Sequence, residues 1–323
     1  MAGMLASPVL LTQIGCKDEK TKRTSSPSNL TKLTMQAAWV NDAEFLGYFV
    51  AIEKKLYEKE GIDLTYLSGG PEVIPEASLL SGKADIALTT PDTTINLILK
   101  DKAPLKIIGT QYQKNPLGIV SLKESGIRKP ADLIGKTLAV PPVNVLSVKA
   151  LLRINNIKEG SVKIVPYQYD PTPLLKKQVD ATVDFTTNVP YAIKLAGGEP
   201  ESFLMYDFGF TIYNDTIVVT EKTLKNKKGE LVGWLKASRK GWEENFRFIE
   251  KYPKKFMKTY FKGTGRTLAN EIFFNKAQRS LIETPEGIFN MNAKGISANI
   301  RALRSIGLNA REEMLTTELL GKI

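Results

Sequence analysis

Short apolar runs alternate with amphipathic segments from Lys32 onward, and this pattern predicts a regular succession of strands and helices. The predicted strands are 33–38, 62–67, 85–88 and 105–111, and the helices between them are 43–59, 76–81 and 92–99. Gly61 stands just past the first helix, where a left-handed residue commonly ends one. The βαβαβαβ order predicts a parallel or mixed α/β sheet.

A second set of alternating segments predicts a second α/β unit. Its predicted strands are 118–122, 137–140, 162–167, 181–185 and 203–206, and its helices are 145–153, 172–178 and one that begins at 189. The β-branched stretch 216–220 predicts a strand that leads the chain back, and the pattern is helical after it. Trp234 and Trp242 lie on one apolar stripe of that region, so we expect them in a core rather than at a ligand.

These patterns predict two α/β lobes that the chain connects twice, near Asn115 and near Asp215. Lobe 1 is predicted from residues 32–115 and 215–323, and lobe 2 from residues 116–214. Two crossings form a two-strand hinge, and a cleft between two such lobes is where a ligand is expected to bind.

The amino-acid composition excludes several classes of metal site and catalytic site. The chain has 323 residues, one Cys and no His, which excludes Cys/His zinc sites, His-ligated haem and Ser-His or Cys-His catalysis. We expect no metal and no cofactor. The net charge of +11 comes from residues 222–304, which hold 19 Lys and Arg against 7 Asp and Glu. No nucleic-acid-binding motif accompanies this positive charge, so we expect no nucleic acid partner. The charge is explained either by a solvated helical surface or by attraction to an anionic membrane.

The N-terminal residues predict a secreted and lipid-anchored protein. Residues 1–16 hold an apolar run that suits a signal peptide, and Cys16 follows Ile14-Gly15 as in a lipobox. Gln13 stands where Leu is usual, and no Lys or Arg precedes the run. Residues 17–31 are polar and Ser/Thr-rich, which predicts a flexible tether. The alternative is a chance Cys in a frayed terminus.

The carboxyl ends of three predicted strands supply candidate ligand-binding residues, because open α/β sheets bind ligands there. Trp39 offers a stacking face and Asn41 both a donor and an acceptor, whereas Asp42 is also a natural helix N-cap. Ser68 and Gly69 follow the second strand and offer backbone donors, with a plain turn as the alternative. Thr89 and Thr90 follow the third strand and offer hydroxyl donors, with a helix N-cap as the alternative.

Lobe 2 and the crossings supply further candidates. Asn144 precedes a predicted helix, and Asp184 and Asn188 end and follow a predicted strand. We expect Tyr112 and Tyr191 to hold a ring from its two sides. For Tyr213, at the second crossing, packing within the hinge is the alternative to ligand contact.

Several segments, in this order and spacing, resemble ABC-transporter substrate-binding proteins of the branch grouped with thiamine-pyrimidine synthases and sulfonate-binding proteins. They are WVNDAEFLGYFVA at 39–51, GIDL at 61–64, SGGP at 68–71, LSGKADIA at 80–87, SGIRKPADLIGK at 125–136, QVD at 178–180 and TNVP at 187–190. The resemblance implies a type II periplasmic binding protein fold. It also implies an envelope location, a permease with its ATPase as partners, a membrane contact through the lipid and a monomer.

The ligand implied by this resemblance is a small flat N-heteroaromatic vitamin precursor, of the thiamine pyrimidine type. A flavin precursor, or a sulfonate such as taurine, is the alternative. Glu44 stands near the place of a His in pyrimidine binders, and Tyr48 belongs to the GYFVA segment that is typical of the flavin branch. Asn188 matches a position at which the family contacts its ligand.

An enzyme of the same fold, thiamine-pyrimidine synthase, is the competing class. Its chemistry is expected to need a His and a Cys-rich motif, and this chain has no His and only Cys16. We therefore expect a binding protein rather than an enzyme. A lipoprotein without a transport role is a third class.

Overall fold

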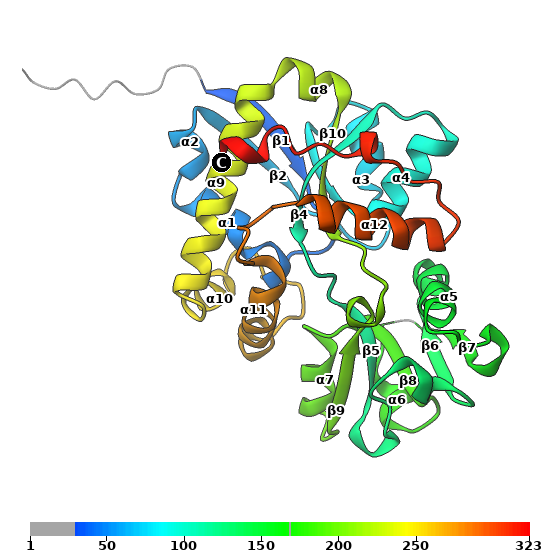
Figure 1. Cartoon of the computed structure of the whole chain (residues 1–323). Helices are drawn as coiled ribbons and strands as arrows, with labels where there is room; N and C mark the ends of the chain where they lie inside the picture. Colours follow the sequence, from blue (N-terminus) through cyan, green and yellow to red (C-terminus); the bar gives the residue numbers. More distant parts are fainter. Residues whose placement is uncertain (1–29, 168) are drawn as a thin grey trace, which may run out of the picture.

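The structure is a computed structural model that describes residues 30–167 and 169–323 and shows two α/β lobes (Figure 1). The predicted signal peptide, Cys16 and residues 17–29 of the predicted tether lie outside the described residues. The predicted tether is one residue too long at its end, because Thr31 already pairs with Ile62 as the first residue of a strand.

Lobe 1 is built on a mixed sheet in the order β2-β1-β3-β10-β4. Its strands are β1 Thr31–Gln36, β2 Ile62–Leu67, β3 Ile86–Thr89, β4 Leu105–Tyr112 and β10 Asn214–Thr220. Strands β1, β2 and β3 run parallel, and β10 runs antiparallel to β3 and β4. The helices of this lobe are α1 Leu46–Glu53, α2 Leu56–Lys59, α3 Pro75–Leu80, α4 Pro91–Lys100, α8 Glu221–Asn226, α9 Lys228–Arg247, α10 Lys251–Phe256, α11 Leu268–Ile282 and α12 Ala293–Ser305.

Lobe 2 is built on a second mixed sheet in the order β7-β6-β8-β5-β9. Its strands are β5 Leu117–Leu122, β6 Thr137–Val140, β7 Lys163–Pro166, β8 Ala181–Phe185 and β9 Pro200–Leu204. Its helices are α5 Val145–Ile154, α6 Thr172–Leu175 and α7 Val189–Leu195. Both sheets therefore combine parallel pairs with antiparallel ones, as the alternating pattern predicted.

Several predicted elements have different bounds in the structure, among them the strand predicted over 33–38, which is β1, and the following three. The predicted helix 43–59 is a 3-10 turn followed by α1 and α2, because Lys55 takes a left-handed φ of 54° between the two helices. The helix predicted over 172–178 ends at Leu175, and Lys177 is left-handed as well. The strand predicted over 203–206 is β9, and a 3-10 turn begins after it at Met205.

Apolar side chains cover both faces of the lobe 1 sheet. One cluster packs α1 and α9 against the sheet and includes Trp234 and Trp242, both with no exposed surface, as the apolar stripe predicted. A second cluster lies on the other face and continues into lobe 2. Within the described ranges, no helix has both the length and the apolar composition needed to cross a bilayer.

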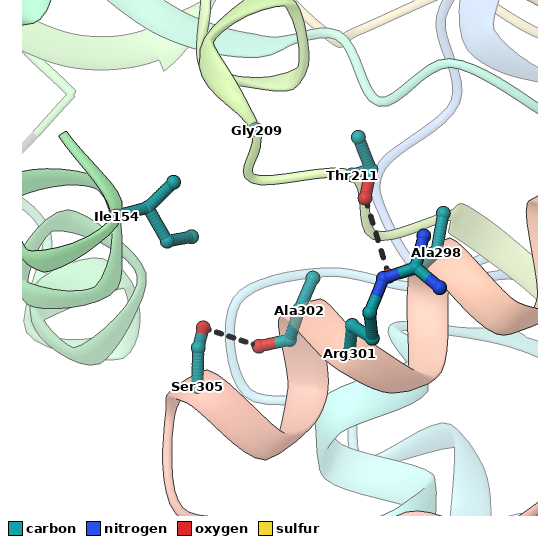
Figure 2. Close-up of a pocket in the computed structure, with 7 residues that line it drawn as sticks. All are labelled: Ile154, Gly209, Thr211, Ala298, Arg301, Ala302 and Ser305. Atoms are coloured by element: carbon teal, nitrogen blue, oxygen red, sulfur yellow. Dashed lines mark hydrogen bonds between the residues drawn. The ribbon is translucent and has the colours of Figure 1, made fainter.

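The two crossings between the lobes are tied to each other and to α12. The Asn115 side chain donates to the carbonyl of Tyr213 at 3.1 Å, and the Tyr213 N–H donates to Asn299 of α12 at 3.0 Å. A pocket of about 300 Å³ lies where α5, the second crossing and α12 meet. Figure 2 shows the residues that line it: Ile154, Gly209, Thr211, Ala298, Arg301, Ala302 and Ser305. None of the predicted ligand-binding residues lines this pocket.

Candidate functional site

The loop that follows β1 carries Trp39, and its position depends on Gly69 in the loop that follows β2. The Gly69 N–H donates to the Trp39 carbonyl at 2.9 Å. A Cβ on Gly69 would lie 2.4 to 2.5 Å from backbone atoms of Ala37, Ala38 and Trp39. Gly69 thus serves the close approach of two loops. Ser68 beside it is exposed, and its carbonyl accepts from Gln36 at 3.0 Å.

Trp39 reaches lobe 2 through an aromatic contact. Its ring centroid lies 5.8 Å from that of Tyr169, which in turn lies 5.7 Å from Tyr167. Both tyrosines follow β7, and Tyr169 is 51% exposed. Trp39, Tyr167 and Tyr169, here called the aromatic trio, therefore join the carboxyl ends of β1 and β7 across the two lobes.

Asp42 caps the turn that leads into α1 and also binds an arginine. Its Oδ1 accepts from the Glu44 N–H at 2.9 Å, so the N-cap interpretation is confirmed. Its Oδ2 accepts from Arg266 at 2.7 Å, and the Asp42 side chain is only 1% exposed. The neighbouring Asn41 accepts from the hydroxyl of Tyr66 at 3.1 Å. The predicted ligand loop is thus held by a cap, an ion pair and a side-chain hydrogen bond.

Four carboxyl groups gather at this end of the lobe 1 sheet, and each residue is at most 5% exposed: Asp42, Glu44, Asp215 and Glu271. We call them the carboxyl cluster. Glu271 of α11 accepts from the Ala43 N–H at 2.6 Å. The Gln111 side chain donates both to Asp215 at 2.8 Å and to the Glu44 carbonyl at 2.9 Å. Backbone and amide donors therefore hold acidic groups that water does not reach.

Burial changes the ionisation of this cluster. It raises the pKa of Asp42 to about 6, against the lowering effect of Arg266. It raises the pKa of Asp215 and of Glu271 to about 7, and the charge of Asp42 adds to both shifts. Burial and the carboxyl of Asp215 raise the pKa of Glu44 well above its ordinary value. Near neutral pH the cluster therefore holds protons and offers both donors and acceptors.

Lobe 2 faces this cluster with polar groups from the end of β8. Burial raises the pKa of Asp184 to about 6, against the Phe185 N–H and the Tyr167 hydroxyl, which lower it. Asn188 accepts from Asn270 of α11 at 3.1 Å across the lobes. Asn270 is the residue before Glu271 and also donates to its carboxylate at 3.1 Å. A chain of hydrogen bonds thus leads from lobe 2 to the carboxyl cluster.

The hydroxyl of Thr187 lies next to this chain of hydrogen bonds. Thr187 is 2% exposed, and its Oγ1 finds no hydrogen-bond partner among the described residues. A buried hydroxyl without a partner is uncommon in folded proteins. The loop 184–188 therefore holds both satisfied and unsatisfied polar groups.

The other polar candidates lie apart from the carboxyl cluster or are already satisfied. The hydroxyl of Thr89 shares hydrogen bonds with Thr94 at 2.6 Å and Thr216 at 3.1 Å inside lobe 1. Thr90 is exposed at the start of α4. Asn144 stands before α5 and makes no side-chain cap.

The structure does not bring Tyr112 and Tyr191 to two sides of one space. Tyr112 is fully buried, and its hydroxyl donates to Gln278 at 2.7 Å. Tyr191 stacks on Phe273 of α11 at 5.2 Å. Each ring has its own partner inside the protein, so the expected sandwich of a ligand between these two tyrosines is wrong.

Tyr48 and Tyr213 are placed as structural residues. Tyr48 is fully buried and stacks with Trp234 at 5.6 Å and with Phe289 at 6.3 Å, inside the core of lobe 1. Tyr213 is 3% exposed and is tied to Asn299 through its backbone at the crossing, which is the alternative that the sequence left open. Tyr48 is thus enclosed by the core of lobe 1 and Tyr213 by the crossing, and neither side chain is open to a ligand.

Sequence reasoning missed a set of residues that meets the predicted ones: Tyr167, Tyr169, Arg266, Asn270 and Glu271. Arg266 lies 224 residues from Asp42 in the chain, and no local pattern connects the two. The one available signal was the Thr267 N-cap of α11, which fixes where that helix begins beside the site. Among the residues that the structure describes, no group of His, Cys, Asp or Glu side chains is arranged to hold a metal ion.

Comparison with known proteins gives the family. A family model described as NMT1/THI5 like matches residues 42–247, so the chain belongs to that family. Riboflavin-binding protein RibY of Chloroflexus aurantiacus is 22% identical over 66% of this chain and 62% of its own length, so the match spans less than two thirds of that relative. The formylaminopyrimidine-binding protein of Halalkalibacterium halodurans is 24% identical over 69% of each chain.

Solved structures agree on the fold. The periplasmic aliphatic sulphonate binding protein SsuA of Escherichia coli superposes with a TM-score of 0.66 at 16% identity, over 84% of this chain and 90% of SsuA. The periplasmic nitrate-binding protein NrtA of Synechocystis has a TM-score of 0.63 at 12% identity, over 91% and 88%. The predicted periplasmic binding protein fold is thereby confirmed, as is the predicted resemblance to this family.

Proposed function

We propose that this NMT1/THI5-like protein is the extracytoplasmic solute-binding protein of an ABC importer. Its ligand would be a small flat N-heteroaromatic vitamin precursor of the thiamine pyrimidine type, bound between the two lobes and delivered to a permease with its ATPase. The fold and the family support this proposal, as do two relatives that are named as binding proteins.

One observation carries the choice of ligand class: aromatic faces and a proton-sharing carboxyl cluster meet at the same end of lobe 1. Trp39 and Tyr169 supply faces for a flat ring. The edge of an aminopyrimidine carries both amino donors and ring-nitrogen acceptors. Carboxyl groups with pKa values between about 6 and about 7 are partly protonated near neutral pH. They can therefore donate hydrogen bonds to the ring nitrogens and accept hydrogen bonds from the amino groups.

The same cluster argues against a sulfonate ligand. A sulfonate is a permanent anion, and Arg266, the cation that the structure places at this cluster, already pairs with Asp42 at 2.7 Å. An added anion would face several carboxyl groups in a buried setting, where repulsion between like charges is strong. A flavin is the second candidate, because RibY is a riboflavin-binding relative and the aromatic trio suits a wide ring system.

For the binding site itself we propose six of the predicted residues together with three that the structure adds. Trp39, Asn41, Glu44, Ser68, Asp184 and Asn188 are retained. Tyr169, Arg266 and Glu271 join them. The protein is proposed as a binding protein and not an enzyme, since the chain lacks the His that the related synthase chemistry needs.

We further propose that a lipid at Cys16 anchors the protein in the cell envelope, and that the protein is a monomer. The test is the mass of the protein extracted from membranes of the producing cells. Lipidation predicts a chain that begins at Cys16 and carries acyl groups, and predicts that Cys16→Ser releases the protein into the soluble fraction. An unmodified Cys16 in the mature chain would contradict it.

The ligand is tested by thermal unfolding of the full chain with hydroxymethylpyrimidine, formylaminopyrimidine, thiamine, riboflavin, FMN, taurine and alkanesulfonates. A ligand that binds the folded state alone raises the melting temperature by mass action. We expect a rise with a pyrimidine and none with the sulfonates. A rise with riboflavin alone would favour the second candidate.

The site is then tested by calorimetric titration of the ligand found. Loss of a stacking partner costs about 1 to 3 kcal/mol for a nucleobase-like ring, so Trp39→Ala should weaken binding about fivefold or more. Phe248→Ala is the control, because Phe248 is an aromatic residue with 42% of its surface exposed and stands beyond the end of α9. Unchanged affinity in Trp39→Ala would refute this site.

A further inference from the structure

The edge of the lobe 1 sheet that is opposite the carboxyl cluster forms a distinct surface. The parallel strands β1, β2 and β3 begin there. The antiparallel strand β10 ends there at Thr220, and α8 follows at once. Figure 1 shows α8 at the end of lobe 1 that lies away from lobe 2. The segments at these strand starts and at α8 are called the amino-end face: 31–32, 59–63, 81–85, 100–104 and 221–228.

The amino-end face is rich in exposed lysines that have no acidic partner. Within residues 30–167 and 169–323, none of the following forms an ion pair: Lys32, Lys59, Lys83, Lys100, Lys102, Lys222 and Lys225. All seven are exposed. A lysine without a carboxylate neighbour keeps its full charge available to an external partner.

The acidic residues of this face are mostly neutralised by other lysines. Asp85 pairs with Lys227 at 2.7 Å. Glu60 pairs with Lys240 at 3.3 Å, and Glu221 lies 3.8 Å from Lys106. In the segments described above, Asp63 and Asp101 are the acidic residues that remain without such a pair. The face is therefore positively charged overall.

We propose that the amino-end face rests on an anionic phospholipid surface. The inference rests on the proposed function, because it takes the lipid at Cys16 as the anchor. Thr31 enters the fold at this face, 15 residues after Cys16, and even a fully extended chain of that length spans at most about 50 Å. The anchor therefore keeps this face within reach of the bilayer, and the lysines act when thermal motion brings them within a Debye length of the surface.

Distance explains why the anchor and the lysines work together. Electrostatic attraction to a charged leaflet falls off over a Debye length of about 8 Å at physiological salt. Close to the surface, each lysine contributes about 1 kcal/mol, which corresponds to about a fivefold gain in partitioning. An orientation with this face down also turns the opposite end of the sheet, with Trp39 and the carboxyl cluster, toward the aqueous side.

A second lysine-rich segment supplies the comparison. Lys251, Lys254, Lys258 and Lys262 lie in and after α10, and they are exposed and form no ion pair in the described part of the chain. They follow the far end of α9, whose 20 residues span about 30 Å. The N-terminal side of the described chain does not enter at that place, since β1 begins beside β2.

The test is sedimentation of the full chain with vesicles of phosphatidylcholine alone, or of three parts phosphatidylcholine to one part phosphatidylglycerol. The amino-end variant combines Lys83→Gln, Lys102→Gln, Lys222→Gln and Lys225→Gln. The control variant combines Lys251→Gln, Lys254→Gln, Lys258→Gln and Lys262→Gln, with the same change of charge. All proteins carry Cys16→Ser, so that binding reports the surface and not an acyl chain.

We expect binding to the anionic vesicles that weakens at high salt, at least about a tenfold loss in the amino-end variant, and less than about a twofold loss in the control. Equal losses in the two variants, or no binding by the parent protein, would overturn the proposal. Equal melting temperatures show that both variants are folded. The assay needs neither solute nor permease, so a negative result here leaves the ligand proposal standing, and the ligand panel can fail without affecting this one.

Discussion

The two ends of the lobe 1 sheet carry opposite charges in opposite environments. At the carboxyl end, Asp42, Asp215 and Glu271 are almost completely buried, and Arg266 pairs with Asp42. At the amino end, lysines such as Lys222 and Lys225 are exposed and unpaired within the described residues. The lesson is that burial, more than the number of charges, determines what a charged group does.

Buried carboxyl groups respond to pH and to ligands, since burial raises their pKa values to between about 6 and about 7 and small changes nearby alter their protonation. Exposed lysines act only on what approaches from outside. The carboxyl end is therefore suited to a small solute, and the amino end to an extended charged surface. Four changes test this contrast, from the largest expected effect to the smallest.

Removal of Arg266 should have the largest effect. Arg266→Met leaves the buried carboxylate of Asp42 without its partner, and breaking a buried pair costs about 3 kcal/mol or more of unfolding free energy. We expect that loss in urea unfolding at pH 8 and a much smaller one at pH 5, where the carboxyl is protonated. Arg266→Lys keeps the charge and serves as control. The same loss at both pH values would show that packing rather than charge is responsible.

Gly69→Ala should disturb the loop that holds Trp39. The added methyl group would meet backbone atoms at 2.4 to 2.5 Å, and overpacking of this kind costs about 1 to 3 kcal/mol. We expect a loss of about 2 kcal/mol in unfolding free energy together with weaker solute binding. Gly70→Ala is the matched control, because its nearest neighbour would be Val40 at 3.9 Å. Similar behaviour of the two variants would contradict this role of Gly69.

The pH dependence of stability should follow the carboxyl cluster. The pKa of Glu271 is about 7 in the fold and about 4.3 in an unfolded chain, so the folded state binds more protons between these values. Its contribution to stability is fully present below about pH 4 and is lost as the pH rises through about 7. We expect Glu271→Gln to raise the unfolding free energy at pH 8 by about 1 kcal/mol and to flatten the profile from pH 5 to 8.

Urea unfolding of the parent protein and of Glu271→Gln over that pH range measures this effect. Glu318→Gln is the control, since Glu318 is an exposed carboxylate paired with Lys228 at 2.7 Å on the other side of lobe 1. A parent profile that rises with pH in this range would show that the cluster does not control stability.

Exposed lysines at the amino end should matter least to stability. Lys222→Gln with Lys225→Gln removes two charges that form no ion pair in the described ranges, so we expect a change of less than about 0.5 kcal/mol in unfolding free energy. Thermal unfolding and urea titration both measure it. A loss above about 1 kcal/mol would mean that these side chains support the fold, and the contrast between the two ends would then be weaker than described.

Several features could be predicted from local sequence because local rules determine them. The alternation of apolar runs predicted both sheets, and the stripe with Trp234 and Trp242 predicted their burial. Asp42 followed from its place just before a helix. The predicted bounds of an element were wrong where one residue interrupted the pattern. Lys55 is an example, because its left-handed backbone divides a predicted helix in two.

The candidate site was only half predictable. Trp39 and Asn188 follow strands, and the rule for the carboxyl ends of sheets found them. Arg266 lies before α11, Glu271 lies in α11, and Tyr169 lies in a loop of the other lobe; nothing in their local sequence points to the site. Tyr48 of α1 and Tyr112 at the end of β4 are both fully buried, because an aromatic side chain serves a core as readily as a ligand.

The sequence by itself determined the order of strands and helices, the apolar stripes and the residues at strand ends, because periodicity and capping act over a few residues. Only the tertiary structure decided which of those residues meet. Asp42 and Glu271 share one buried space because α11 packs beside the turn that begins α1, and their pKa values depend on that burial. Ionisation in a protein follows from desolvation and from neighbouring charges, and both are properties of the folded chain rather than of its local sequence.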